Sequence, residues 1–144
     1  MQNNACPLVS ILLVEDDDVD AMGIERAFKK FKVTNPIVRA RDGLEALEML
    51  RTNVVSRPYI ILLDLNMPRM NGLEMLAELR NDAKLTDSIV FVLTTSKDDT
   101  DKTSSYKEHI AGYMVKSSLE RGFGDLIKLL DNYGRLVEMP VDRD

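Results

Sequence analysis

The sequence has one cysteine, one histidine and no tryptophan among its 144 residues. With Cys6 alone the chain cannot form an internal disulfide, and one histidine, His109, with one cysteine cannot supply the ligands of a zinc site. Nothing therefore points to an oxidising compartment, and a cytoplasmic location is the default expectation. A domain of this length typically buries about 70% of its unfolded surface, so it needs no disulfide or structural metal to fold.

Long hydrophobic runs and an excess of positive charge are also missing. The first apolar run extends only from Val9 to Val14, far short of the ~20 residues that cross a bilayer, so we expect no membrane association. The formal net charge is −5, which argues against nucleic-acid binding because such binding depends on clustered Lys and Arg. The local cluster Lys29, Lys30 and Lys32 falls where a first helix would end, and cations are favoured there.

Apolar runs alternate with helix-like stretches five times along the chain. The predicted strands are residues 11–14, 37–40, 59–63, 89–93 and 112–115, and the predicted helices are 18–31, 44–50, 73–79, 99–109 and 123–133, the last followed by Gly134 as a C′ glycine. This alternation implies right-handed βαβ units and a parallel sheet. We predict an α/β, flavodoxin-like, doubly wound sheet of five strands in the order 2-1-3-4-5 with five helices. It forms one domain over residues 9–134, between an N-terminal extension (1–8) and a C-terminal tail (135–144).

Polar side chains follow four of the five predicted strands. Glu15 and Asp16 follow the first strand, Asp64 the third, Thr94 the fourth and Lys116 the fifth. The second strand ends without a comparable group and lies at an edge of the predicted sheet. Because the carboxyl ends of parallel strands meet at one rim, these five side chains are expected to lie close together.

Three carboxylates at one rim would repel one another unless a cation joined them. Magnesium suits such a site, because it prefers oxygen ligands and is commonly held by one or two carboxylates plus a phosphate. A carboxylate beside that ion can attack phosphorus and form an aspartyl phosphate, a reaction that needs mainly positioning and charge neutralisation. Lys116 supplies a positive charge and Thr94 a hydroxyl donor, so the rim has the groups that phosphoryl transfer to Asp64 requires.

Each of these residues also has a simpler interpretation. Any of residues 16–18 could cap the following helix, Thr94 could cap another, and Lys116 could be a solvated charge. A coincidence at all four strand ends is much less expected than a shared site. An EF-hand is excluded, because Ala21 and Ala27 occupy the positions of its glycine and final glutamate. The sequence contains no P-loop or complete GxGxxG motif.

The motifs at the strand ends resemble the receiver domains of two-component response regulators. They are ILLVEDDD (11–18), LLDLNMPRMNG (62–72), VLTTS (92–96) and GYMVK (112–116), in that order and over essentially the whole chain. By position, the resemblance implies that Asp64 is the phosphoacceptor and that Lys116 binds the phosphate. Glu15 and Asp16 would hold Mg²⁺ together with the backbone carbonyl of Asn66. Thr94 would be the switch hydroxyl, and Tyr113 would change rotamer with it.

The resemblance also implies a signalling cycle and its partners. A histidine kinase supplies the phosphoryl group, and a downstream signalling protein reads the surface made by the fourth helix, fifth strand and fifth helix. The chain is expected to catalyse its own phosphotransfer and dephosphorylation without being an enzyme, with Asn66 and Ser96 placed to tune the dephosphorylation rate. No output domain is expected, and a homodimer is compatible with this interpretation. The stretch 42–47 and the ending 136–140 are most similar to stand-alone regulators paired with bacterial phytochrome-type kinases.

One position departs from the family pattern. The family usually has a proline, commonly preceded by a cis bond, where this chain has Ser117. A cis bond before a non-proline residue costs about 2.5–4 kcal/mol, so we expect a trans bond here. Residues 117–120 fit a capping box, but Gly122 and Gly124 place the stable helix from about Phe123.

Two alternatives to the phosphorylated receiver remain, and the missing proline supports only the first. The first is a pseudo-receiver that keeps the fold as an interaction module and signals without phosphate. The second is a phosphohydrolase that uses an aspartyl-phosphate intermediate. Such hydrolases commonly carry a second acid two residues after the nucleophile, where this chain has Asn66.

Overall fold

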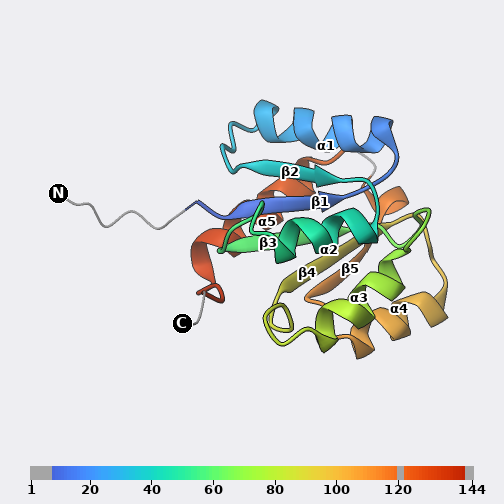
Figure 1. The fold of residues 1–144 in the computed structure, drawn as a ribbon. Helices are drawn as coiled ribbons and strands as arrows, with labels where there is room; N and C mark the ends of the chain where they lie inside the picture. Colours follow the sequence, from blue (N-terminus) through green and yellow to red (C-terminus); the bar gives the residue numbers. More distant parts are fainter. Residues whose placement is uncertain (1–7, 120–121, 142–144) are drawn as a thin grey trace.

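The computed structural model describes residues 8–119 and 122–141. The strands β1 (Ser10–Val14), β2 (Ile37–Ala40), β3 (Tyr59–Leu63), β4 (Ile89–Thr94) and β5 (Gly112–Val115) form one parallel sheet in the order β2-β1-β3-β4-β5. The helices are α1 (Asp18–Lys30), α2 (Gly43–Arg51), α3 (Gly72–Asn81), α4 (Asp99–Lys107) and α5 (Gly124–Leu136), with a 3₁₀ turn, η1 (Lys116–Ser118), before α5 (Figure 1). The predicted flavodoxin-like fold and strand order are confirmed.

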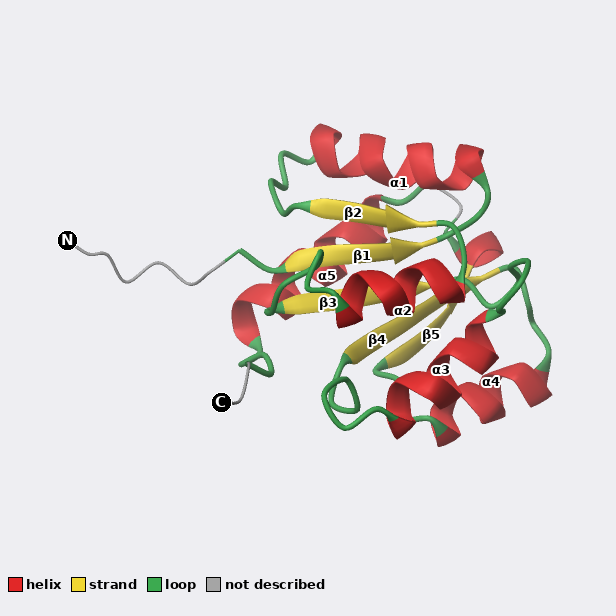
Figure 2. Cartoon of the chain, viewed as in Figure 1, coloured by secondary structure: helices red, strands yellow, loops and turns green. Residues whose placement is uncertain are grey.

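Helices cover both faces of the sheet, which explains why the central strands are continuously apolar (Figure 2). Leu12 and Val14 of β1 pack in a core with residues of α2 and α3, whereas Ile11 and Leu13 pack on the other face with residues of α1 and α5. Every residue of β3 is buried, as expected of a central parallel strand. Among the described residues, no helix has both the length and the apolar character needed to cross a bilayer.

The ends of α4 and α5 differ from the prediction. Gly134 is not a C′ residue, because α5 continues to Leu136 and is followed by Val137. A Cβ at Gly134 would lie 3.2 Å from Cγ2 of Val9, so this glycine allows α5 to pack closely against the start of the sheet and does not end the helix. α4 ends at Lys107, and His109 follows in the left-handed conformation with φ 61°.

The start of α5 agrees with the prediction, since the helix begins at Gly124 directly after Phe123. The expected capping box cannot be followed in the structure, because Glu120 lies outside the described residues. Cys6 and most of the N-terminal extension lie outside them as well.

Arg80, in the last turn of α3, joins several segments at the amino edge of the sheet. Its guanidinium donates to the carbonyl oxygens of Glu108 at 2.6 Å, Thr86 at 2.6 Å, Ser88 at 2.8 Å and His109 at 3.0 Å. One side chain therefore satisfies carbonyls of the loop before β4 and of the end of α4, which would otherwise need separate partners.

We expect Arg80→Ala to lower the free energy of unfolding by about 2–4 kcal/mol, because it removes charge-assisted hydrogen bonds and leaves their acceptors without a donor. Urea denaturation measures the change. Arg51→Ala is the matched control, since Arg51 is 45% exposed and pairs at the surface with Asp82 and Glu78. Its loss should cost less than about 1 kcal/mol. Equal effects of the two substitutions would contradict this role for Arg80.

Candidate functional site

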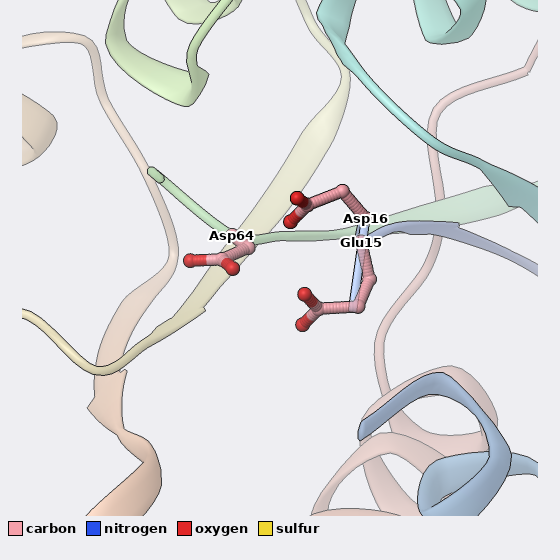
Figure 3. A group of neighbouring side chains, drawn as sticks. All are labelled: Glu15, Asp16 and Asp64. Carbon is pink, nitrogen blue, oxygen red and sulfur yellow. The ribbon is translucent and has the colours of Figure 1, made fainter. Parts of the chain in front are cut away.

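The carboxyl edge of the sheet brings three acidic side chains together, as the sequence predicts. Glu15 and Asp16 follow β1, and Asp64 follows β3, the strand that pairs with β1. One carboxylate oxygen from each residue lies within 4.8 Å of the others. Figure 3 shows the Glu15 and Asp16 side chains leaving the end of β1 on opposite sides, with both carboxylates turned toward Asp64. Glu15 and Asp64 are buried, whereas Asp16 is exposed.

Lys116 reaches this cluster from the end of β5, an edge strand of the sheet. Its Nζ lies 2.8 Å from Oε1 of Glu15 and 3.4 Å from Oδ2 of Asp64. It also lies 2.6 Å from Oδ2 of Asp20, in the first turn of α1. Burial disfavours the charged ammonium, but the hydrogen bonds to Asp20 and Glu15 outweigh this effect and raise the pKa of Lys116. The lysine is therefore a fixed positive charge beside Asp64.

Glu15 is the carboxylate that the site perturbs most. Burial is the largest cause that raises its pKa to about 7; the hydrogen bond from Lys116 opposes the rise, and the negative charge of Asp64 adds to it. Closely spaced carboxylates in a buried site favour binding of a further cation, because that cation relieves both their desolvation and their mutual repulsion.

The donor set fits a hard divalent cation such as Mg²⁺. Glu15, Asp16 and Asp64 offer only carboxylate oxygens, which such ions prefer. Asn66 lies in the same loop as Asp64, and its N–H donates to Oδ1 of Asp64 at 3.2 Å. That bond orients the Asp64 carboxylate, while the role of the Asn66 carbonyl as a fourth ligand remains a prediction.

Thr94 and Tyr113 are joined through the loop that follows β4. Thr94 is fully buried, and its Oγ1 accepts a hydrogen bond from the N–H of Ser96 at 3.3 Å. The hydroxyl of Tyr113 donates to the carbonyl of the same Ser96 at 3.0 Å. Ser96 itself donates its hydroxyl to Asp101 of α4 at 2.7 Å. A change at Thr94 can therefore reach both β5 and α4 through one residue.

The loop after Asp64 is held tightly against the sheet. The N–H of Gly72 donates to the carbonyl of Leu65, and a Cβ at Gly72 would lie 2.6 Å from the carbonyl oxygen of Asp64. Only glycine fits there without moving the backbone of Asp64 and Leu65. The loop is also tied to α2, because Arg69 pairs with Asp42 at 2.5 Å and the N–H of Gly43 donates to the carbonyl of Met70.

Asp20 was not among the predicted site residues. It lies beyond the acidic run 15–18, in which residues 16–18 were considered as helix caps and Asp16 also as a metal ligand. Asp17 does act as the cap and accepts hydrogen bonds from the N–H groups of Val19 and Asp20. Asp18 instead pairs with Arg39 and Arg41. The spacing of a carboxylate in the first helical turn was the available signal, but its partner Lys116 lies 96 residues away.

The expected trans bond after Lys116 is confirmed, since the one cis peptide among the described residues precedes Pro58. Lys116 opens the 3₁₀ turn η1, which has no side-chain cap. The position of its ammonium is therefore set by the carboxylates at the other end of the side chain.

A hollow of about 560 Å³ lies at the opposite, amino edge of the sheet, between the end of α2 and the loop before β4. The ion pairs Arg51–Asp82 and Arg57–Asp87 lie on its wall. None of the predicted site residues lines it.

Comparisons with known proteins agree with this geometry. A family model described as the response regulator receiver domain matches residues 11–128. Response regulator Rcp1 of Synechocystis sp. is 36% identical over 134 residues, which cover 90% of this chain and 89% of Rcp1. The probable methanogenesis regulatory protein FilR2 of Methanothrix harundinacea is 40% identical over 109 residues, covering 74% of this chain and 70% of FilR2.

Solved structures give the same picture. The phosphorylated cyanobacterial phytochrome response regulator RcpA is similar with a TM-score of 0.82 at 34% identity, covering 93% of this chain and 99% of that one. The Mn²⁺-bound form of Rcp1 is similar with a TM-score of 0.80 at 33% identity, covering 94% of this chain and all of that one (100%).

The Asp42–Arg69 pair yields a pH-dependent prediction. Burial opposes ionisation of Asp42, but the hydrogen bonds from the Glu45 N–H and Arg69 hold its pKa below the usual value. A depressed folded-state pKa contributes stability above the unfolded pKa of about 3.9, and that contribution is lost as the pH falls through the folded value. Asp42→Asn keeps a cap acceptor but loses the charge, so it should cost about 1–2 kcal/mol at pH 7.

Urea denaturation at neutral and strongly acidic pH measures this difference, which should shrink on acidification. Asp99→Asn is the control, since Asp99 is 93% exposed and its contact with Lys102 is 3.7 Å. Its effect should stay within about 0.5 kcal/mol at both pH values. A cost of Asp42→Asn that does not change with pH would contradict the ion-pair account.

Proposed function

Because this chain belongs to the response regulator receiver family, we propose that it accepts a phosphoryl group from a histidine kinase on the carboxylate of Asp64. In this proposal residues 9–134 act as the receiver unit. The observation that carries the proposal is the environment of Asp64, which is buried beside Glu15 and within 3.4 Å of the Lys116 ammonium.

In the transfer step, a carboxylate oxygen of Asp64 forms a bond to phosphorus while the P–N bond of the phosphohistidine breaks. The imidazole leaves with the electron pair of that bond. The Asn66 N–H, 3.2 Å from Oδ1 of Asp64, holds the nucleophile in one orientation. The Lys116 ammonium faces the other oxygen and is placed to neutralise charge on the phosphoryl group.

Glu15, Asp16 and Asp64 would hold Mg²⁺, with the Asn66 carbonyl as a further ligand. When bound, this ion would neutralise negative charge shared between the carboxylates and the phosphoryl oxygens. The Mn²⁺-bound form of Rcp1 supports a divalent ion in such a cluster. Hydrolysis ends the cycle, as a water oxygen bonds to phosphorus, the bond to Asp64 breaks, and phosphate and the free carboxylate are released. The chain therefore acts on its own acceptor and not on a separate substrate.

The signal would pass through Thr94, Ser96 and Tyr113. A phosphoryl oxygen that accepts a hydrogen bond from the buried Thr94 hydroxyl would draw that side chain toward Asp64. Two hydrogen bonds of Ser96 would then change: the one that its N–H donates to Thr94, and the one that its carbonyl accepts from the Tyr113 hydroxyl. The contacts differ between the two states, so phosphorylation biases the population of the α4–β5–α5 surface that a downstream protein reads.

The likeness to Rcp1 and to the phytochrome response regulator RcpA supports a kinase of the bacterial phytochrome type as the phosphoryl donor. The pseudo-receiver alternative rested on the missing proline. It loses that support, because Lys116 approaches Asp64 with Ser117 in place of proline. The phosphohydrolase alternative gains no support, since Asn66 supplies no second acid.

Incubation with Mg²⁺ and acetyl phosphate should add one phosphoryl group to the chain, as measured by intact mass. Asp64→Asn should abolish the adduct, because the amide cannot act as the nucleophile. Asp87→Asn is a matched control at the opposite edge of the sheet, where Asp87 pairs with Arg57.

The Asp87→Asn variant should form the adduct at the rate of the unmodified protein. An adduct that persists in Asp64→Asn would refute the site assignment. Rapid multiple turnover of acetyl phosphate, with no accumulated adduct, would favour the phosphohydrolase.

A further inference from the structure

Lys116 contacts three carboxylates, and these three are not equivalent. Its Nζ lies 2.6 Å from Asp20, 2.8 Å from Glu15 and 3.4 Å from Asp64. An ammonium has three donors, so these carboxylates together use its full hydrogen-bonding capacity. The shortest contact is made by the residue that does not belong to the acidic cluster.

Glu15 and Asp64 both contact Lys116 and also belong to the acidic cluster. Both offer an oxygen to the set that fits a divalent cation, together with Asp16. A cation bound there would draw on the same two carboxylates and would repel the nearby ammonium. Asp20 lies outside that set, on the α1 side of Lys116, so its charge remains available to the lysine alone.

We propose that Asp20 is a positioning residue that keeps the Lys116 ammonium beside Asp64 while a divalent cation occupies the neighbouring carboxylates. The inference rests on the proposed function of Asp64 and deepens it. Asp20 would act through Lys116 and would not touch the phosphoryl group itself.

The start of α1 places Asp20 accurately for this role. The Asp17 carboxylate caps the helix by accepting the N–H groups of Val19 at 2.8 Å and Asp20 at 3.1 Å. The N–H of Asp17 in turn donates to Oε2 of Glu15 at 3.2 Å. The same short segment therefore fixes Glu15, the helix cap and Asp20 relative to one another.

This arrangement also explains how the Lys116 side chain is directed toward Asp64 although no proline follows it. Lys116 directly follows the edge strand β5 and opens the uncapped 3₁₀ turn that continues with Ser117. Its side chain extends across the carboxyl edge of the sheet to α1. It is 11% exposed, so the ion pair with Asp20 lies at the boundary between site and solvent.

Chemical labelling of Lys116 tests the proposal without measuring activity. The full chain is treated with limiting acetic anhydride, with and without Mg²⁺, and acetylation of Lys116 is quantified by peptide mass spectrometry relative to Lys102. In the wild-type protein, Lys116 should stay protected from acetylation with and without Mg²⁺. In Asp20→Asn it should stay protected without Mg²⁺, where Glu15 and Asp64 still hold it, and become several-fold more reactive with Mg²⁺.

Asp18→Asn is the matched control, since it removes a charge from the same helical turn but from a residue paired with Arg39 and Arg41. Its labelling pattern should match that of the unmodified protein. Labelling that rises equally with and without Mg²⁺ in Asp20→Asn would indicate a merely structural role and overturn the proposal. Continued protection of Lys116 with Mg²⁺ would overturn it as well.

The rate of adduct formation from acetyl phosphate gives a second readout. Asp20→Asn should slow it by about tenfold, a typical effect of losing a residue that orients a group in such a site. In a Lys116→Ala background the same substitution should have no further effect. A faster rate in Asp20→Asn would mean that Asp20 competes with the phosphoryl group for the lysine, and would contradict the proposal. If the unmodified protein forms no adduct, the proposed function fails, whereas the labelling experiment still reports on Asp20.

Discussion

Charge balance at the carboxyl edge of the sheet is the constraint on which the site depends. Glu15 and Asp64 are buried within reach of each other, and burial of like charges without a counter-charge is strongly unfavourable. The Lys116 ammonium supplies part of that counter-charge. Burial works against its charged form, but the hydrogen bonds to Asp20 and Glu15 raise the pKa of Lys116. Burial nevertheless raises the pKa of Glu15 to about 7, and the negative charge of Asp64 adds to the rise. A divalent cation bound by these carboxylates would relieve both the desolvation and the repulsion.

The rest of the fold serves to hold that edge in place. A parallel sheet covered on both faces directs all its strand ends to one rim, so residues distant in sequence meet without long loops. Gly72 lets the loop after Asp64 pass within contact of the acceptor strand, and the Asp42–Arg69 pair ties that loop to α2. At the other edge, Arg80 satisfies four carbonyls and fixes the start of β4 relative to α4. The carboxyl edge is polar and carries closely spaced negative charges, whereas the two faces of the sheet carry the apolar cores.

Most of the fold and most of the site could be predicted from the sequence, for a physical reason. Strands buried on both faces appear as short apolar runs, and the residue after each run must lie at the carboxyl edge of the sheet. The convergence of Glu15, Asp64 and Lys116 therefore followed from local patterns. The parts that were missed depend on contacts that local patterns do not encode. In the sequence, Asp20 is one of several acids at the start of a helix, and only the fold shows its contact with Lys116. Gly134 resembles a helix terminator, and only the fold shows that it packs against Val9. Arg80 carried no motif at all.

A crystal structure of the chain with Mg²⁺ and beryllofluoride, which mimics an acyl phosphate, tests the central claim most directly. The account predicts beryllium bonded to a carboxylate oxygen of Asp64, with the Lys116 ammonium and the Thr94 hydroxyl both contacting its fluorides and Mg²⁺ bound by Glu15, Asp16 and Asp64. Beryllofluoride bound at another residue, or an Asp64 that stays unmodified while Mg²⁺ occupies the cluster, would contradict it.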